Sequence, residues 1–396
     1  MRVALITYST KPRGGVVHTL DLAEALAAIG VEVTVWSLAR QGDRGFFRPV
    51  DSRVALRLIE FPDRPDESVT DRIVRSIDAM RRAFTPDRYD IVHAQDCISA
   101  NAVGTCIRTI HHLDQFTTPI LVECHEKAVV EPYARICVSA AVAAEVAAGW
   151  GLRPTVIPNG VRAQRFTAAA ADPAAQRRWT DELGSYVLTV GGIEPRKGTV
   201  DLVEAYHLFR QRVPDVALVI AGGETLFDYR DYRAEFERRC ARLGVEPVIL
   251  GAVADGELPG LVAAAAVFAF PSTKEGFGLA AMEALAAGRP VVARDLPVLR
   301  EVFGDTVRYA SDVRGLADGL VSAVGDRNPA PAVGDRNPAP AVGDRNPAPA
   351  VGDRNPAPAV AGARAEAGRA LAESMTWAAA ARAHVAFYRD HPKPAH

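Results

Sequence analysis

Apolar residues along the chain fall into short continuous runs, separated by stretches with a 3.6-residue period. The first run, VALITYS (3–9), is followed by HTLDLAEALAAIG (18–30), which has helical spacing, and then by VEVTVWSLA (31–39). Short continuous apolar runs are typical of strands buried on both faces, and the helical period between them indicates covering helices. The pattern therefore predicts a parallel sheet with helices on both sides.

The same alternation continues along the chain and predicts two domains. Further strands of the first series are predicted at DIVHAQ (90–95), PILVECH (119–125), RICVS (135–139) and PTVIPNG (154–160). After a polar stretch at 162–181, a second series has helices predicted at 200–209 and 231–243 and strands predicted at SYVLTVGG (185–192), VALVIAGG (216–223), PVILGAV (247–253), AAVFAFPS (265–272) and RPVVARD (289–295). We expect two doubly wound, Rossmann-like α/β domains, over residues 1–162 and 163–375, with a helix at about 376–391 packing back on the first.

A repeated segment interrupts the second series. The nonamer AVGDRNPAP occurs four times without substitution between residues 323 and 358. Each copy offers one valine as its only sizeable apolar side chain, which is too little buried surface to offset the entropy of ordering. We therefore expect a disordered insert over 323–358. A solenoid is the alternative, but this composition lacks a strand-forming core register.

Composition excludes several classes of function. The 396 residues carry a formal net charge of -2, so there is no basic excess of the kind that a nucleic-acid-binding protein shows. The five cysteines include no CxxC pair, which argues against a disulfide framework or a zinc site. No apolar run is long enough for a signal peptide core or a membrane span, so we expect a soluble, cytoplasmic protein.

The segment EGFGLAAME (275–283) carries one acid at each end of an apolar stretch. It follows a predicted strand and opens a predicted helix, so Glu275 is expected at a strand-to-helix junction, where free backbone N–H groups can bind a phosphate or a polyhydroxyl ligand. If the segment is helical throughout, Glu283 lies roughly 12 Å further along the axis. Two carboxylates that far apart cannot share one reacting centre, but they can contact the two ends of a nucleotide sugar. An ordinary amphipathic helix with a surface glutamate is the alternative.

The segment VGGIEPRKG (190–198) also follows a predicted strand. Gly191 and Gly192 permit close backbone approach, and Arg196 and Lys197 offer two adjacent cations for a diphosphate. A solvated turn with two surface cations remains the alternative.

Two further segments are weaker candidates. Gly14 and Gly15 follow the first predicted strand, where a phosphate or sugar could approach their amides, although a tight turn explains them equally well. His111 and His112 in TIHHLDQF lack a third ligand at metal-binding spacing. His93 and Asp96 lie at a predicted strand end, but neither is specific by itself. Core or hydrogen-bonding histidines are the commoner case.

Taken together, PRGGVVHTLDLAEALAAIGVEVTV, VIPNGV, VGGIEPRKG, VIAGG, PSTKEGFGLAAMEALAAGRPVVA, EVFGD and the late tryptophan in MTWAAAARA resemble the retaining GT-B glycosyltransferases of glycosyltransferase family 4. The resemblance covers nearly the whole chain apart from the nonamers. It implies two Rossmann-like domains that face a central cleft, with the acceptor on the first domain and the nucleoside diphosphate sugar on the second. The chain departs from the family pattern at Gly192, where arginine is frequent, and at Arg162, where aspartate is usual.

By matching motifs, the resemblance implies a role for each candidate residue. Glu275 and His111 would face the donor sugar, and Arg196 and Lys197 would hold the diphosphate and neutralise its charge as it leaves. The remaining implied contacts are Gly15 near the phosphates, Glu283 at the ribose hydroxyls, and the backbone of Phe277, Gly278 and Leu279 along the sugar and phosphate. Which of His111 and His112 faces the donor stays open. The chain contains no D-x-D segment, so we expect neither a metal nor another cofactor.

The leading hypothesis is a metal-independent retaining transferase that moves a hexosyl unit from a nucleoside diphosphate sugar to an acceptor that the sequence does not identify. A nucleotide-sugar epimerase of similar architecture and a non-catalytic sugar-nucleotide-binding protein are the alternatives. No nucleic-acid partner is expected.

Weak peripheral membrane association is a further hypothesis for TDRIVRSIDAMRRAF (70–84). Its apolar positions Ile73, Ile77, Met80 and Phe84 fall on one side of a helix, with arginines nearby, which would suit anionic headgroups. Packing of that side on the protein's own sheet is the alternative.

Overall fold

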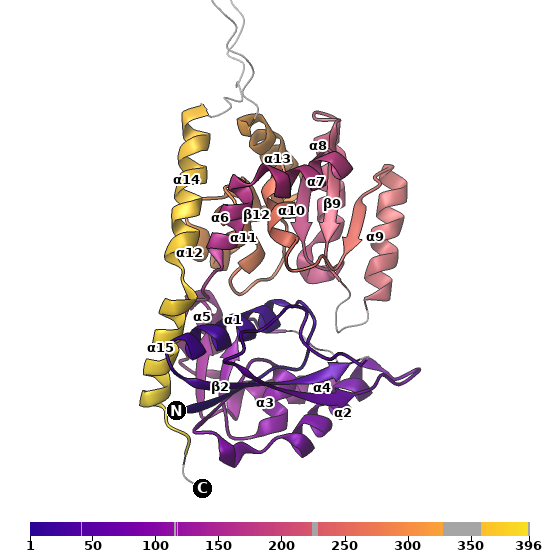
Figure 1. Cartoon of the computed structure of the whole chain (residues 1–396). Helices are drawn as coiled ribbons and strands as arrows, with labels where there is room; N and C mark the ends of the chain where they lie inside the picture. Colours follow the sequence, from indigo (N-terminus) through magenta and orange to yellow (C-terminus); the bar gives the residue numbers. More distant parts are fainter. Residues whose placement is uncertain (41, 115, 117, 224–228, 328–357, 395–396) are drawn as a thin grey trace, which may run out of the picture.

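The structure is a computed structural model that describes all residues except 41, 115, 117, 224–228, 328–357 and 395–396. Its described residues form two parallel sheets, one in each half of the molecule (Figure 1). The first sheet has the order β3 (Ala55–Phe61), β2 (Glu32–Arg40), β1 (Arg2–Ile6), β4 (Ile91–Ala94), β5 (Ile107–Ile110), β6 (Ala134–Cys137), β7 (Thr155–Val156). The second has the order β10 (Val248–Gly251), β9 (Val216–Ala221), β8 (Ser185–Val190), β11 (Val267–Phe270), β12 (Val291–Arg294), β13 (Arg308–Ala310).

In each sheet the strand order reverses beside the strand that comes first in the chain. The reversal lies between β1 and β4 in the first sheet and between β8 and β11 in the second. Loops diverge at such a point and leave a crevice at the carboxyl ends of the strands, which is where ligands bind in doubly wound folds. The prediction of two doubly wound α/β domains is confirmed.

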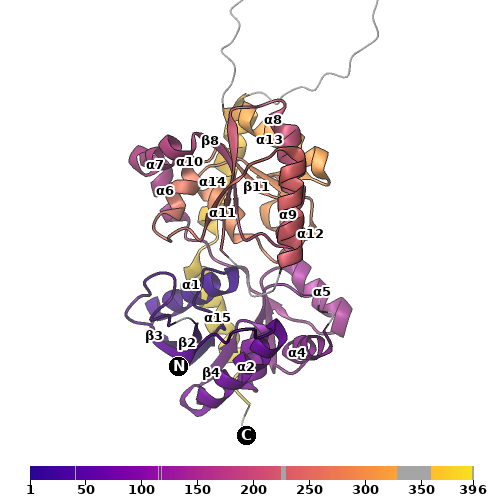
Figure 2. The ribbon, with the colours of Figure 1, turned by 90° about the vertical axis from the view of Figure 1, so that its right-hand side faces the viewer.

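Helices cover both faces of each sheet (Figure 2). The first half contains α1 (Gly14–Ala28), α2 (Val69–Ala83), α3 (Cys97–Val103), α4 (Pro119–Val130), α5 (Ala140–Trp150) and a short 3-10 helix, η1 (Pro86–Arg88). The second half contains α6 (Ala163–Ala171), α7 (Pro173–Leu183), η2 (Pro195–Lys197), α8 (Thr199–Arg210), α9 (Arg230–Leu243), α10 (Leu258–Ala264), α11 (Leu279–Ala286), α12 (Pro297–Phe303), α13 (Val313–Arg327) and α14 (Pro358–Ser374). The last helix, α15 (Trp377–Asp390), packs against α1.

The strand β1 illustrates why its residues form a central strand. Val3 and Leu5 pack in the core on the side of α1 and α15, and Ala4 and Ile6 pack on the side of α2 and α3. All four side chains are fully buried. Complete burial of a side chain such as Leu5 stabilises the fold by about 1.5–3 kcal/mol, which explains the continuous apolar run.

The chain passes between the halves twice, near residues 160–161 and near residues 375–377. These two crossings touch each other. Val161 N donates a 2.8 Å hydrogen bond to Met375 O, and a Cβ at Gly160 would lie 2.3 Å from Trp377 N. A second contact joins α12 to the start of α5, where the carboxylate of Glu301 accepts from two backbone N–H groups at 2.7 and 2.8 Å. The two crossings therefore form a hinge, and the contact of Glu301 with α5 joins the halves at a separate place.

Three parts of the sequence-based prediction need correction. The run PILVECH is not a strand: it lies in α4, whose Pro119 suits the first helical turn and whose buried residues Leu121, Ala128 and Val129 form one face. The strands β3, β5 and β13 were not predicted. The expected disordered insert is wrong at its ends, because residues 323–327 continue α13, with Ala323 buried, and Pro358 begins α14. Its remainder, 328–357, lies outside the described residues.

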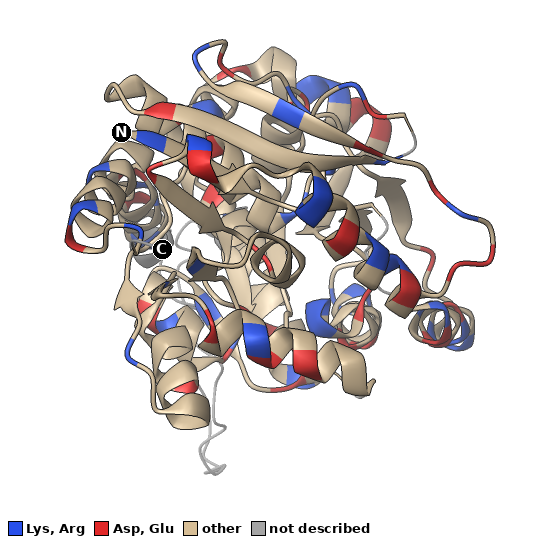
Figure 3. Ribbon diagram, turned by 90° about the horizontal axis from the view of Figure 1, so that it is seen from below, with Lys and Arg blue, Asp and Glu red and all other residues tan. Residues whose placement is uncertain are grey.

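The helix considered for membrane docking packs on its own sheet. Ile73, Ile77 and Met80 of α2 are buried in the core of the first half, together with Phe84. Arg75 forms an ion pair with Glu67, at 2.5 Å. In the view of Figure 3, basic and acidic residues are interspersed along the helices. No helix among the described residues is long and apolar enough to cross a membrane.

Candidate active site

The loops after β8 and β11 are packed onto each other. Gly198, which ends η2, has φ +63°, and a Cβ there would lie 2.3 Å from the carbonyl oxygen of Pro271. Thr273 N donates a 2.8 Å hydrogen bond to Arg196 O. Because β8 and β11 are neighbours at the point of strand-order reversal, these contacts bring the cations of one loop to the acid of the other.

Glu275 is the centre of an ion-pair cluster. Its Oε1 lies 2.7 Å from Lys197 Nζ and 3.1 Å from Arg196 Nη1, and the same guanidinium lies 3.0 Å from Glu194. Burial alone would raise the pKa of Glu275, but the charges of Lys197 and Arg196 outweigh it and lower that pKa to about 2. The carboxylate is therefore ionised, and the two cations are held together at the strand ends.

The turn after Glu275 requires its two glycines. A Cβ at Gly276 would lie 1.6 Å from the carbonyl oxygen of His111, so this turn packs directly on the first half of the molecule. Gly278 has φ +98°, and a Cβ there would lie 2.8 Å from the ring of Phe303. Within the described residues, no side chain caps the start of α11 at Leu279. Uncapped N–H groups at a helix start are suited to binding an anion.

The expected helical spacing of the two glutamates is wrong, because α11 begins at Leu279 and the residues before it are not helical. Glu283 is half-buried on α11. Burial, followed by the negative charge of Asp21, raises the pKa of Glu283 to about 8, although Arg165 and Arg162 act in the opposite direction. Glu283 therefore lies beside the hinge, close to ion pairs that join Arg165 to Asp255 and Arg48 to Asp21.

His111 lies directly after β5, against the start of α1. A Cβ at Gly15 would lie 3.6 Å from its Cδ2 atom. Burial, followed by the charges of Arg108 and His112, lowers the pKa of His111 well below its usual range, so the ring is neutral. His112 is oriented differently, with its Nε2 atom 3.1 Å from Asp114 Oδ1.

The structure thus brings some predicted residues together and separates others. Glu275, Arg196 and Lys197 form one cluster, and the turn that follows them contacts His111, which lies beside Gly15. Phe277 is buried in the core of the second half. Glu283 is among the hinge charges. The functional roles of these residues stay predictions.

His93 and Asp96, which the sequence placed at a strand end, both have structural partners. His93 bonds to Tyr388 Oη at 2.8 Å and to Thr109 Oγ1 at 2.7 Å, and Asp96 caps α3 by accepting from Ser99 N. Sequence reasoning missed Glu194 and Asp114, although each stands inside a motif that was singled out. Among the described residues, no group of three or more His, Cys, Asp or Glu side chains is arranged to hold a metal ion.

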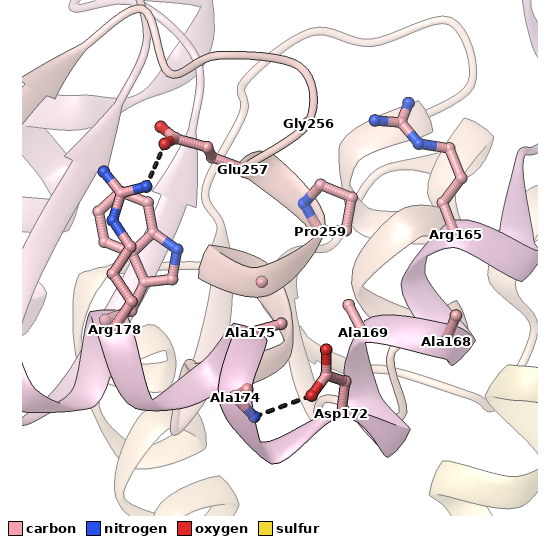
Figure 4. Close-up of a pocket in the computed structure, with 12 residues that line it drawn as sticks. Arg165, Ala168, Ala169, Asp172, Ala174, Ala175, Arg178, Gly256, Glu257 and Pro259 are labelled. Carbon is pink, nitrogen blue, oxygen red and sulfur yellow. Dashed lines mark hydrogen bonds and ion pairs between the residues drawn. The ribbon is translucent and has the colours of Figure 1, made fainter.

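A pocket of about 490 Å³ lies elsewhere, between α6, α7 and α10 (Figure 4). Two of its polar side chains have partners within it: Arg178 pairs with Glu257, and Asp172 accepts from Ala174 N at 2.8 Å. None of the predicted site residues lines it.

Two Rossmann-like halves, each with glycine-bearing loops and charged groups at its strand-order reversal, define the architecture of a GT-B glycosyltransferase. The family model "Glycosyltransferase Family 4" matches residues 12–165, and "Glycosyl transferases group 1" matches residues 176–328. The chain belongs to the GT-B glycosyltransferases of group 1 and family 4 and is a glycosyltransferase.

Named relatives agree with the family assignment. The chain is 30% identical over 359 residues to a phosphatidyl-myo-inositol mannosyltransferase of Mycobacterium tuberculosis, covering 82% of this chain and 88% of the relative. It is 29% identical over 334 residues to a D-inositol 3-phosphate glycosyltransferase of Pseudarthrobacter chlorophenolicus, covering 74% and 78%.

Solved structures share the fold. Sucrose-phosphate synthase of Thermosynechococcus elongatus superposes with a TM-score of 0.74 at 19% identity, over 98% of each chain. Anabaena HepE in complex with UDP and glucose superposes with a TM-score of 0.69 at 18% identity, over 99% of this chain and 100% of the other. At these identities the likeness concerns the fold.

Proposed function

We propose that the protein transfers a hexosyl unit from a nucleoside diphosphate sugar to an acceptor hydroxyl, with retention of configuration and without a metal. The observation that carries the proposal is the cluster of Glu275, Arg196 and Lys197 at the carboxyl ends of β8 and β11, with the turn after Glu275 packed against His111. One acid and two cations at a strand-order reversal offer hydrogen bonding to sugar hydroxyls and charge compensation for a diphosphate.

The two cations supply the main electrostatic contribution in this proposal. The charges of the two cations are paired with those of Glu275 and Glu194. A bound diphosphate adds negative charge beside them, and more charge develops on the leaving phosphate oxygen as the bond to the sugar breaks. Preorganised cations stabilise that developing charge, which is the role that a metal ion fills in other transferases.

The reaction that we propose needs no protein nucleophile. The bond from the acceptor oxygen to the anomeric carbon forms on the face from which the diphosphate leaves, and the bond from that carbon to the phosphate oxygen breaks. The acceptor proton passes to the departing phosphate oxygen. Glu275 then orients the sugar hydroxyls, and neutral His111 lies beside the reacting face.

The names of the relatives guide the choice of acceptor. Both are named for inositol-containing molecules, myo-inositol in a phospholipid and inositol 3-phosphate. We therefore place inositol phosphates first among the acceptors to be tried, with UDP-, GDP- and ADP-sugars as donors.

Replacing Lys197 by alanine tests the proposal. We expect turnover of the donor, with or without acceptor, to fall by about 10–100-fold, because a hydrogen bond to a charged group contributes about 1.5–3 kcal/mol. Lys274→Ala is the matched control, since this lysine lies in the neighbouring loop and faces Glu145, at 3.9 Å. Equal turnover of the Lys197 variant and the wild type would reject the role of the cation, and activity that requires Mn²⁺ or Mg²⁺ would reject metal independence.

A further inference from the structure

His18 is a buried histidine of α1 that the proposed chemistry does not use. Its side chain is 1% exposed, and its Nδ1 atom lies 2.8 Å from Asn159 Oδ1. Since the amide oxygen accepts, Nδ1 carries the proton and donates. Its Nε2 atom is buried and has no hydrogen-bond partner among the described residues.

The ring of His18 touches the two crossings that form the hinge. Asn159, its hydrogen-bond partner, immediately precedes Gly160, which packs on the backbone of Trp377. The ring of Trp377 itself lies edge-on to His18, with centroids 5.2 Å apart. His18 is therefore fixed to both segments that connect the halves.

The same ring also contacts His111. The two centroids lie 4.7 Å apart, with an angle of 76° between the ring planes. The Nε2 atom of His111 is buried and, within the part of the chain that the structure describes, has no hydrogen-bond partner. Packing against His18 and Gly15 therefore contributes to the orientation of the His111 ring, while its carbonyl oxygen packs on Gly276 of the donor-side turn.

We infer that His18 is a positioning residue, whose ring holds that of His111 in place and joins it to the hinge through Asn159 and Trp377. The consequence for catalysis rests on the proposed function of His111, but the effect on ring orientation does not. A shift of about 1 Å in a group at a reacting centre can lower a rate by about 100-fold.

Two variants separate the ring contact from the hydrogen bond. His18→Asn keeps a side-chain amide near the position of Nδ1 that can bond to Asn159, but removes the ring. His18→Phe keeps an aromatic edge and loses the bond. His384→Phe is the matched control, because this histidine is 0% exposed and its ring centroid lies 6.2 Å from that of His18.

The first readout needs no substrate. The full chain is labelled with ¹³C in its histidine rings, the signal of His111 is assigned by its loss in His111→Asn, and ring relaxation is measured. We expect the His111 ring to become more mobile in His18→Asn, and to stay close to wild type in His18→Phe and His384→Phe. Equal relaxation in His18→Asn and the wild type would overturn the inference.

The second readout is donor hydrolysis with UDP-glucose, GDP-mannose and ADP-glucose as probes. For a donor that the wild type hydrolyses, we expect kcat to fall about 10–100-fold in His18→Asn, with KM changed less than about twofold, and partial recovery in His18→Phe. A rise in KM at unchanged kcat would overturn positioning. If the wild type neither hydrolyses any of the probes nor transfers their sugar to an inositol phosphate, the proposed function fails, while ring relaxation still decides the inference.

Discussion

Glu283 allows a quantitative prediction about pH and stability. Its carboxyl group lies beside Asp21 and close to the hinge, and burial raises its pKa from an ordinary 4.5 to about 8. The folded chain therefore binds this proton more tightly than the unfolded chain does. The contribution of Glu283 to the free energy of unfolding is fully present below pH 4.5. It is lost as the pH rises toward 8, and it does not change further above that value.

The size of the effect follows from the pKa difference. At about 1.4 kcal/mol for each pKa unit, complete burial would give a loss of about 5 kcal/mol between pH 4.5 and 8. Glu283 is half-buried, so screening by solvent reduces the expected loss to about 2–3 kcal/mol. Glu283→Gln keeps the shape of the neutral acid and should lack this loss.

The assay is urea unfolding of the wild type, Glu283→Gln and the exposed control Glu246→Gln at several pH values from 5 to 9. We expect the glutamine variant at position 283 to gain stability relative to the wild type as the pH rises, and the control to follow the wild type. Parallel curves for the wild type and Glu283→Gln would refute the reasoning about the buried acid.

Three further substitutions test the turn before α11 and the contacts between the two halves. Gly278→Ala puts a Cβ against Phe303 at a φ of +98°, which should cost about 1–3 kcal/mol and lower the urea midpoint; an unchanged midpoint contradicts this strain. Gly160→Ala forces the crossings apart at Trp377, so small-angle scattering should give a larger radius of gyration, and an unchanged radius with unchanged stability would contradict the close approach. Glu301→Ala removes two hydrogen bonds to the start of α5, where hydrogen exchange should become about tenfold faster; equal exchange rates count against this contact.

Much of the fold could be predicted because parallel strands have a distinctive sequence pattern. Residues 3–6 are buried on both faces of the first sheet, so they form a continuous apolar run, and the same holds for residues 267–270. The run at 119–125 has a similar composition but lies in a helix, with Ile120 and Val122 more than 40% exposed. A short apolar run does not reveal whether both of its faces will be covered, which depends on the rest of the chain.

The sequence predicted the separate motifs of the candidate site, but not which of their residues form ion pairs with each other. The motifs that contain Glu275 and Lys197 could be found because each follows a strand, but their ion pair joins residues 78 positions apart. The contact between His18 and Asn159 spans 141 positions and joins α1 to the segment that follows β7. Such contacts arise from tertiary packing, so local spacing could not predict them.

The central claim is that a nucleoside diphosphate sugar binds at Glu275, Arg196 and Lys197 without a metal. Isothermal titration calorimetry with UDP-glucose, GDP-mannose and ADP-glucose, in the presence of a chelator, tests it most directly. We expect at least one donor to bind the wild type and the Lys274→Ala control equally, and to bind Lys197→Ala about 10–100-fold more weakly. Binding of equal strength to Lys197→Ala, or binding that appears only after a divalent metal is added, would contradict the claim.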